Sequence, residues 1–270
     1  MNDNKILVPV DFTEAADTAL EFASMIAEKS GLGVTLLHIE DEKSGSRSEE
    51  GLMGRAEKLA KEKCLSCEFR IRKGSIFTEI AAEAASEAYE LMIIGTHGFK
   101  GLREKLLGSD ILKLVKNIPV PVIVLQKGYK APAEGIRKIV FPAGTHKAFQ
   151  LNIKATVYIA RLYQAEVLMY AIEKPGQDWS EELKSNMELA RREFEANHIT
   201  CRRVVEKQTT FSMGYSKQIL KYAKEIGADM ISVMSIPTPE HYYFADSDKE
   251  LLLINEHLIP VLSTSDRKSI

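Results

Sequence analysis

Three glycines and a serine in the first half of the chain have a spacing that suits contact with a phosphate group. Gly95 and Gly98 are separated by two residues and follow the apolar run 91–94, and Gly108-Ser109 comes after nine further residues. A glycine at the end of a strand lets the backbone approach a ligand, because no Cβ is in the way. A helix that begins at Gly108 would direct free N–H groups and the positive end of its dipole at an anion. The same glycines also suit ordinary turns, because short glycine patterns recur by chance.

The elements that must position these residues alternate between strand and helix. Short apolar or alternating runs predict strands at 6–10, 34–39, 67–72, 91–94 and 120–125. Helical spacing predicts helices at 13–27, 76–89 and 109–116. A further helix is expected to follow a loop at 41–54 and to end at residue 64. Thr13 is suited to cap the first helix, and Gly31 to end it. This alternation predicts an α/β fold with a parallel, doubly wound sheet, whose ligands bind at the carboxyl ends of the strands.

The whole pattern occurs twice in the chain. Lys5–Val10 aligns with Lys138–Ala143 at an offset of 133 residues, and Pro121-Val122 aligns with Pro260-Val261 at an offset of 139. The six extra residues therefore enter the second copy between these blocks, around 179–210. The second copy has matching strand patterns near 139–142, 166–172, 202–205, 230–234 and 259–262. We predict two tandem domains, 1–127 and 138–266, joined by a linker at 128–137 that contains glycine and proline.

The second copy lacks the residues that single out the first. Met234 would add bulk where the backbone must approach a ligand, and Pro237 removes an N–H donor. An acidic side chain also replaces the serine of the Gly-Ser pair. At the matched positions Gly144 stands for Asp11, Met234 for Gly95, Pro237 for Gly98, Ser247 for Gly108 and Asp248 for Ser109. We therefore expect one site per chain, in the first domain, and a degenerate second domain.

The spaced glycines and several strand endings resemble the universal stress protein (UspA) family. The first strand ends in Val8-Pro9-Val10-Asp11, the second reads Leu37-His38-Ile39-Glu40, and 117–122 reads Asn-Ile-Pro-Val-Pro-Val. The resemblance implies a five-stranded parallel sheet in the order 3-2-1-4-5, of the Rossmann-like, adenine nucleotide α-hydrolase-like kind, in each half. In this family the last strands pair antiparallel between subunits. A tandem chain can meet this within itself as a pseudo-dimer, and a homodimer of chains is also compatible.

The same resemblance implies a site for ATP or a related adenine nucleotide, such as AMP or ADP. It assigns the ribose hydroxyls to a carboxylate, the adenine to apolar walls and the phosphates to glycines and a hydroxyl. By position these are Asp11 for the ribose, Pro9, Val10 and Ile39 for the adenine, Gly95 and Gly98 for the ribose and phosphates, and Gly108 and Ser109 for the phosphate oxygens. Asp11 also has an ordinary reading, as a negative charge near the start of a helix.

Asp110 departs from the family pattern, which has a small or apolar residue after the Gly-Ser pair. Its charge would either weaken the binding of a triphosphate or require a metal ion, such as Mg²⁺, between the two. Lys100, Arg103 and Lys105 lie in the same loop and could offset this charge, although they also read as solvated loop residues.

Composition excludes several other classes of protein. The formal net charge of −2 and the pI near 6.3 indicate neither nucleic acid nor a membrane surface as a partner. No apolar run reaches the roughly 18–20 residues of a membrane span, and the first residues do not have the layout of a signal peptide. Three cysteines are too few for a disulfide framework. A cytoplasmic location is the expectation.

The residues point to binding and not to catalysis, and two alternatives stay open. No Walker loop, Gly-x-Ser-x-Gly elbow or metal-ligand spacing is present in the sequence, so we expect no enzyme, with slow ATP hydrolysis left open. One alternative is a nucleotide-free scaffold for a protein partner, in which 241–244 of the second copy (His-Tyr-Tyr-Phe) either lines a surface or packs as an ordinary loop. The other is a thiol redox sensor that uses Cys64 and Cys67, against which plain packing is favoured.

Overall fold

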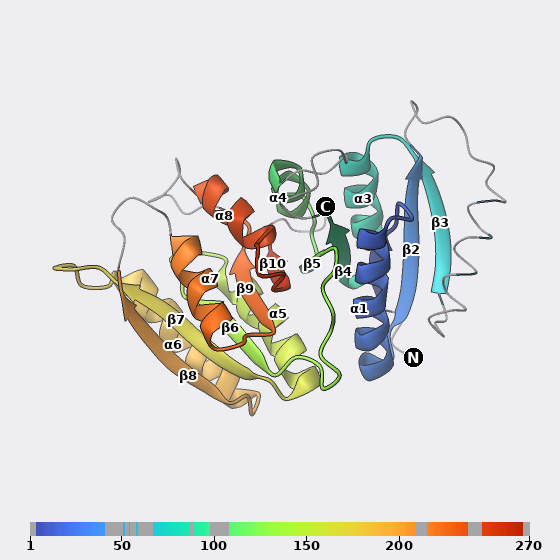
Figure 1. The fold of residues 1–270 in the computed structure, drawn as a ribbon. Coiled ribbons are helices and arrows are strands. Elements are labelled where there is room, and N and C mark those ends of the chain that lie inside the picture. Colours follow the sequence, from blue (N-terminus) through green and yellow to red (C-terminus); the bar gives the residue numbers. More distant parts are fainter. Residues whose placement is uncertain are drawn as a thin grey trace.

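The strands of both halves form one continuous sheet (Figure 1). The computed structural model describes residues 4–40, 51, 54, 58, 67–86, 89–97, 108–208, 215–236 and 245–266. Over these residues the sheet has ten strands, in the order β3-β2-β1-β4-β5-β10-β9-β6-β7-β8. Each half therefore has the predicted order 3-2-1-4-5, and the two halves meet at their fifth strands.

The first half consists of strands that alternate with helices, as the sequence predicts. Its elements are β1 (Lys5–Pro9), α1 (Glu14–Ser30), β2 (Gly33–Glu40), β3 (Cys67–Lys73), α3 (Ile76–Ser86), β4 (Tyr89–Thr96), α4 (Gly108–Lys116) and β5 (Val122–Gln126). All strand pairs within this half are parallel. Gly31 ends α1 in the left-handed region at φ 72°, where glycine carries no steric penalty.

The second half repeats this order. Its elements are β6 (Lys138–Pro142), α5 (Phe149–Tyr163), β7 (Glu166–Glu173), α6 (Glu181–Ala196), β8 (Cys201–Lys207), α7 (Tyr215–Glu225), β9 (Met230–Met234), α8 (Ala245–Leu253) and β10 (Val261–Thr264). Its strand pairs are again parallel.

The two halves are joined by the antiparallel pair β5 and β10. Val122 faces Ser263, Ile123 faces Leu262 and Val124 faces Val261. All residues of both strands are buried, so the pairing removes two apolar edges that would otherwise be open to other chains. The chain thus forms the pseudo-dimer within itself that a tandem arrangement allows.

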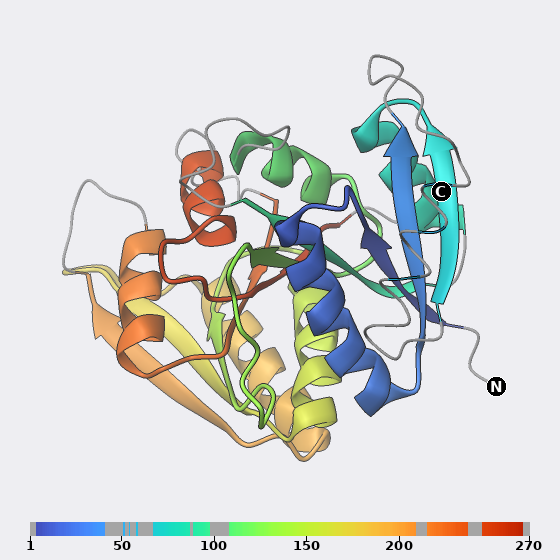
Figure 2. The same ribbon diagram turned by 45° about the vertical axis from the view of Figure 1, so that its right-hand side comes forward.

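Helices cover both faces of the sheet (Figure 2). They give two apolar cores, each of which extends across both halves. One core contains residues of α1, α5 and α6, and the other contains residues of α3, α4, α7 and α8. Both faces are apolar because parallel strands covered on both sides carry hydrophobic residues at nearly every position. No helix within the described ranges is long and apolar enough to cross a membrane.

Besides shifts of one or two residues at strand ends, two predicted features differ from the structure. The helix expected at 76–89 ends at Ser86, and Tyr89 is instead the first residue of β4, where it pairs with Lys5. Thr13 is the N-cap of α1, as predicted, but its hydroxyl does not cap the helix. It donates instead to Asp11 Oδ1 at 2.6 Å.

Candidate functional site

The first candidate residues lie at the carboxyl end of β1. Val10 is only 4% exposed, and its side chain belongs to the α1 core, so the backbone is what it presents at this edge. Its N–H donates to Leu37 O at 2.8 Å, which ties the end of β1 to β2. Pro9 and Ile39, the other two predicted adenine contacts, are half-buried. They therefore keep apolar surface at this edge of the sheet.

Asp11 is exposed at the same edge and also serves the start of α1. Its Oδ1 accepts the Thr13 N–H at 3.0 Å and the Thr13 hydroxyl at 2.6 Å. This supports its reading as a residue of the helix start. Oδ2 has no hydrogen bond to any residue in the described part of the chain, so one carboxylate oxygen stays available to a diol. The two readings of Asp11 are compatible.

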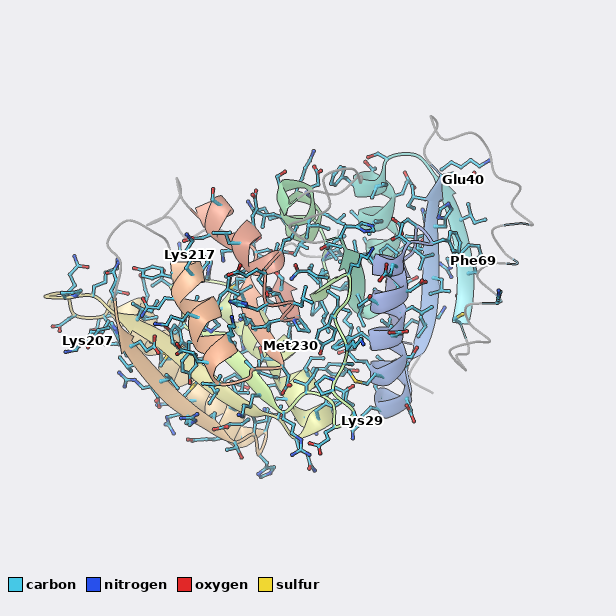
Figure 3. The ribbon with its side chains drawn as sticks, in the orientation of Figure 1. Lys29, Glu40, Phe69, Lys207, Lys217 and Met230 are labelled. Atoms are coloured by element: carbon cyan, nitrogen blue, oxygen red, sulfur yellow. The ribbon has the colours of Figure 1, made fainter. Side chains whose placement is uncertain are left out.

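Two further residues at this edge were missed by the sequence interpretation. Phe12 has a φ of 61°, which is rare for a residue with a large side chain. Its ring centroid lies 5.1 Å from that of His38 and 6.3 Å from that of Phe69. Phe69 lies on β3 (Figure 3). His38 Nδ1 is 2.8 Å from Val10 O. Together they hold the turn between β1 and α1 against β2. No local pattern indicates this, because the contacts join three separate elements.

Gly95 has a packing role that the sequence does not reveal. A Cβ at this position would lie 1.8 Å from Ala15 O and 2.4 Å from Ala15 C, both backbone atoms of the first turn of α1. Only glycine allows β4 and the start of α1 to come so close. The next residue, Thr96, is buried, and its carbonyl accepts the Lys127 N–H at 2.7 Å.

The predicted phosphate-facing helix exists and begins where expected. Helix α4 starts at Gly108, with Ser109 exposed and Asp110 half-buried in the first turn. The N–H groups of the first turn of a helix have no partner within the helix, so this end can receive an anion. Gly98 and the loop residues Lys100, Arg103 and Lys105 lie outside the described residues.

In the second half, side chains of the chain itself fill the equivalent edge. Met234 takes the place of Gly95 and is only 2% exposed. The Lys249 ammonium, from α8, donates to Met234 O. Helix α5 makes room for Met234 by beginning at Phe149, whereas the counterpart of Glu14 is residue 147. The bulkier side chain of Met234 is therefore accompanied by a later start of α5.

His146 and Asn186 lie near Gly144 at this second edge. Burial, with a smaller contribution from the Lys249 charge, lowers the pKa of His146 to about 3. Asn186 Nδ2 donates to Gly144 O at 2.8 Å, and Gly144 is the counterpart of Asp11. Asp248, the counterpart of Ser109, accepts the Ser216 hydroxyl at 2.7 Å. The segment 241–244 lies outside the described residues.

The thiols have an unreactive setting where the structure describes them. Burial raises the pKa of Cys67 and that of Cys201, which disfavours the nucleophilic thiolate. Cys64 lies outside the described residues. Within the described ranges, no group of three or more His, Cys, Asp or Glu side chains could hold a metal ion.

Comparison with known proteins finds relatives in sequence for the first half of the chain. Residues 4–126 match the family model of the universal stress protein family. Universal stress protein MJ0577 of Methanocaldococcus jannaschii is 28% identical over 153 residues, covering 46% of this chain and 94% of that protein. Universal stress protein YxiE of Bacillus subtilis is 25% identical over 146 residues, covering 46% of this chain and 99% of that protein.

A solved structure extends the likeness in fold to the whole chain. The crystal structure of a universal stress protein from Archaeoglobus fulgidus has a TM-score of 0.74, with 16% identity, and covers 99% of this chain and 100% of that chain. At this identity the likeness concerns the fold alone. The first half of this chain, residues 4–126, belongs to the universal stress protein family.

Proposed function

We propose that the first half binds ATP or a related adenine nucleotide, such as ADP or AMP, and that the second half does not. The chain would then act as a stress-response or regulatory protein that binds a nucleotide at one site. We assign it to the cytoplasm on composition alone, because three cysteines in 270 residues suit a reducing compartment.

The observation that carries this proposal is the contrast between two equivalent edges of one sheet. In the first half, the edge presents an exposed carboxylate on Asp11 and the start of α4 with Ser109 exposed. In the second half, Met234 and the Lys249 ammonium lie at the matching place. Because both halves share one fold, the difference lies in these side chains and in the later start of α5.

The types of residue at the first edge suit the chemical groups of an adenine nucleotide. Asp11 can accept hydrogen bonds from ribose hydroxyls through Oδ2, and Pro9 and Ile39 offer apolar surface to the base. The start of α4 and the Ser109 hydroxyl offer donors to phosphate oxygens. Asp110 in the first turn places a negative charge close to these donors. We therefore expect Mg²⁺ to strengthen the binding of ATP more than that of AMP.

We propose binding without turnover. We assign the Asp11 carboxylate, which accepts two hydrogen bonds from Thr13, to the ribose and not to a water beside the phosphates, so the described part of this edge offers no side chain for a general base. If bound ATP releases phosphate faster than ATP does in solution without the protein, this part of the proposal is contradicted.

Native mass spectrometry and calorimetry with ATP, ADP and AMP test the site. We expect one nucleotide per chain. Ser109→Asp, which brings in the residue of the second half, should weaken binding at least tenfold through like charge. The matched variant Asp248→Ser should leave the stoichiometry at one, because Met234 and Lys249 still occupy the second edge. Two nucleotides per chain, or none, would overturn the proposal.

A nucleotide-free scaffold is the second candidate, and one observation favours it. Gly95 is required by its contact with Ala15 whether or not a ligand binds, so its presence is no argument for a nucleotide. The double variant Gly98→Val with Gly108→Val separates the two functions. If it changes neither nucleotide response nor partner binding, the scaffold interpretation holds.

A further inference from the structure

Lys113 is an exposed lysine of α4, one helical turn beyond Ser109. Residues four positions apart on a helix are neighbours on its surface, so the two side chains lie on the same face of α4. The Lys113 Nζ lies 4.7 Å from the centroid of the Phe77 ring. Phe77 belongs to the first turn of α3, which begins shortly after β3 ends. The ammonium is therefore held at the carboxyl edge of the sheet, where α4 also begins.

The ammonium also lies on the side of the sheet that carries the proposed adenine contacts. Ile39 and Phe77 both pack against the apolar core that contains residues of α3 and α4. Leu7 belongs to this core, and Pro9 follows it by two residues on β1, so Pro9 faces the same side. A nucleotide whose base lies against Pro9 and Ile39 would thus extend its phosphates on the side where Lys113 lies.

Three other described cations at this edge are paired with carboxylates. Arg72 Nε donates to Glu83 Oε2 at 2.6 Å, Lys73 Nζ lies 3.5 Å from Glu40 Oε2, and Lys127 Nζ lies 2.7 Å from Glu14 Oε2. Lys113 instead contacts an aromatic ring, and no carboxylate of the described residues forms an ion pair with it. Asp110, the acidic residue of α4, precedes it by three positions. A phosphate at the start of α4 can therefore attract the Lys113 ammonium without breaking an ion pair of the described chain.

The second half has neither the ring nor the lysine. At the offset of 139 residues, the counterpart of Phe77 is Ser216 and that of Lys113 is Leu252. Leu252 is only 5% exposed, and the Ser216 hydroxyl donates to Asp248 Oδ1 at 2.7 Å, so α7 is tied directly to the first turn of α8. The lysine and its ring therefore occur in the half that keeps the Gly-Ser pair.

We infer that Lys113 is a phosphate-binding residue of the first half: Phe77 holds its ammonium at the edge, and a phosphate bound at the start of α4 takes the ammonium over. This role rests on the proposed nucleotide function and adds a residue outside the glycine pattern. Ser109 and Lys113 are about 6 Å apart along the helix axis. The flexible four-carbon stem of a lysine spans a similar distance and leans back towards the helix start. A charged hydrogen bond to phosphate is also stronger than an exposed contact with a phenyl ring.

Calorimetry with ATP and with adenosine, on the full chain and on Lys113→Met, tests this role. Methionine keeps an unbranched side chain and removes the charge. The Kd for ATP should rise about tenfold, the effect of losing one charged hydrogen bond. Adenosine carries no phosphate, so its binding should not change. Lys113→Arg keeps a cation at the same place and should restore most of the affinity for ATP.

Lys29→Met is the matched control. Lys29 is also an exposed lysine above an aromatic ring, with its Nζ 5.7 Å from the centroid of Tyr163. It lies in the last turn of α1, at the opposite end of the first half from Glu40, the last residue of β2 (Figure 3). This substitution should change the binding of neither ATP nor adenosine.

Nuclear magnetic resonance of the Lys113 Cε protons follows the ammonium directly. The Phe77 ring current should shift these protons upfield, Phe77→Leu should identify the shifted signal by abolishing it, and saturating ATP should also remove the shift. If ATP binds but the shift remains, or Lys113→Met binds ATP as tightly as the unsubstituted chain, the inference is overturned while the nucleotide site stands. It is also overturned if Lys113→Met weakens adenosine as much as ATP, because the lysine would then be structural. If the unsubstituted chain binds no nucleotide, the proposed function and this inference both fall.

Discussion

Substituting Gly95 by alanine is the sharpest available test of how the first half is built. The added Cβ would lie 1.8 Å from the carbonyl oxygen of Ala15, whereas ordinary contact begins near 3.4 Å. Both sides of this contact are backbone, so no rotamer change can relieve it. Either β4 or the first turn of α1 must move by about 1.6 Å to restore ordinary contact.

The expected cost follows from what such a movement disturbs. Ala15, Ala16 and Ala19 of α1 are at most 4% exposed, and a shift of the helix start loosens their contacts with the sheet. Inserting atoms into a closely packed core costs about 1–3 kcal/mol when neighbours can adapt. Because backbone is the obstacle here, we expect Gly95→Ala to lower the free energy of unfolding by about 3 kcal/mol.

Urea denaturation followed by circular dichroism measures this effect, with Gly33→Ala as the control. Gly33 also lies in a parallel strand of the first half, but its added Cβ would meet only Lys5 Cγ at 3.6 Å, so we expect a change within about 0.5 kcal/mol. A Gly95→Ala chain with the midpoint of the unsubstituted chain would show that α1 does not lie against β4 as described. The role assigned to Met234, which takes the place of Gly95 in the second half, would then be wrong as well.

Three further predictions concern buried charge. Glu83→Gln should lower the free energy of unfolding by about 2 kcal/mol in urea denaturation, because the fully buried Glu83 carboxylate bonds Arg72 Nε at 2.6 Å and Tyr89 OH at 2.7 Å; an unchanged midpoint would refute this. Between about pH 6.5 and about pH 3, His146 is neutral in the folded chain but takes up a proton in the unfolded chain. The free energy of unfolding should therefore fall by up to about 1.4 kcal/mol for each unit by which the pH drops in this range. His146→Asn should flatten this decline. Lys249→Met should raise the pKa of His146 in an NMR titration, and a value that stays at about 3 would show that the Lys249 charge does not reach the ring.

Much of the fold follows from local pattern. Strands 6–10, 34–39 and 139–142, and the helix that begins near Ser109, lie within one or two residues of their predicted places. They are recognised because parallel strands buried on both faces read as short continuous apolar runs. The alanine-rich stretch before Tyr89 continues the helical spacing, so the sequence predicts a helix through this residue. Its pairing with Lys5 on β1, far away in the sequence, places it in a strand.

The candidate site divides in the same way. The sequence by itself determined the duplication, the loss of the glycine pattern in the second copy and the presence of Asp11 and the Gly-Ser pair at element ends, because these depend on residue type and spacing along the chain. The tertiary structure alone decided that Gly95 is needed by Ala15 and that Lys249 reaches Met234. Each of these joins residues from different elements, and contacts of that kind are fixed only when the sheet brings the elements together.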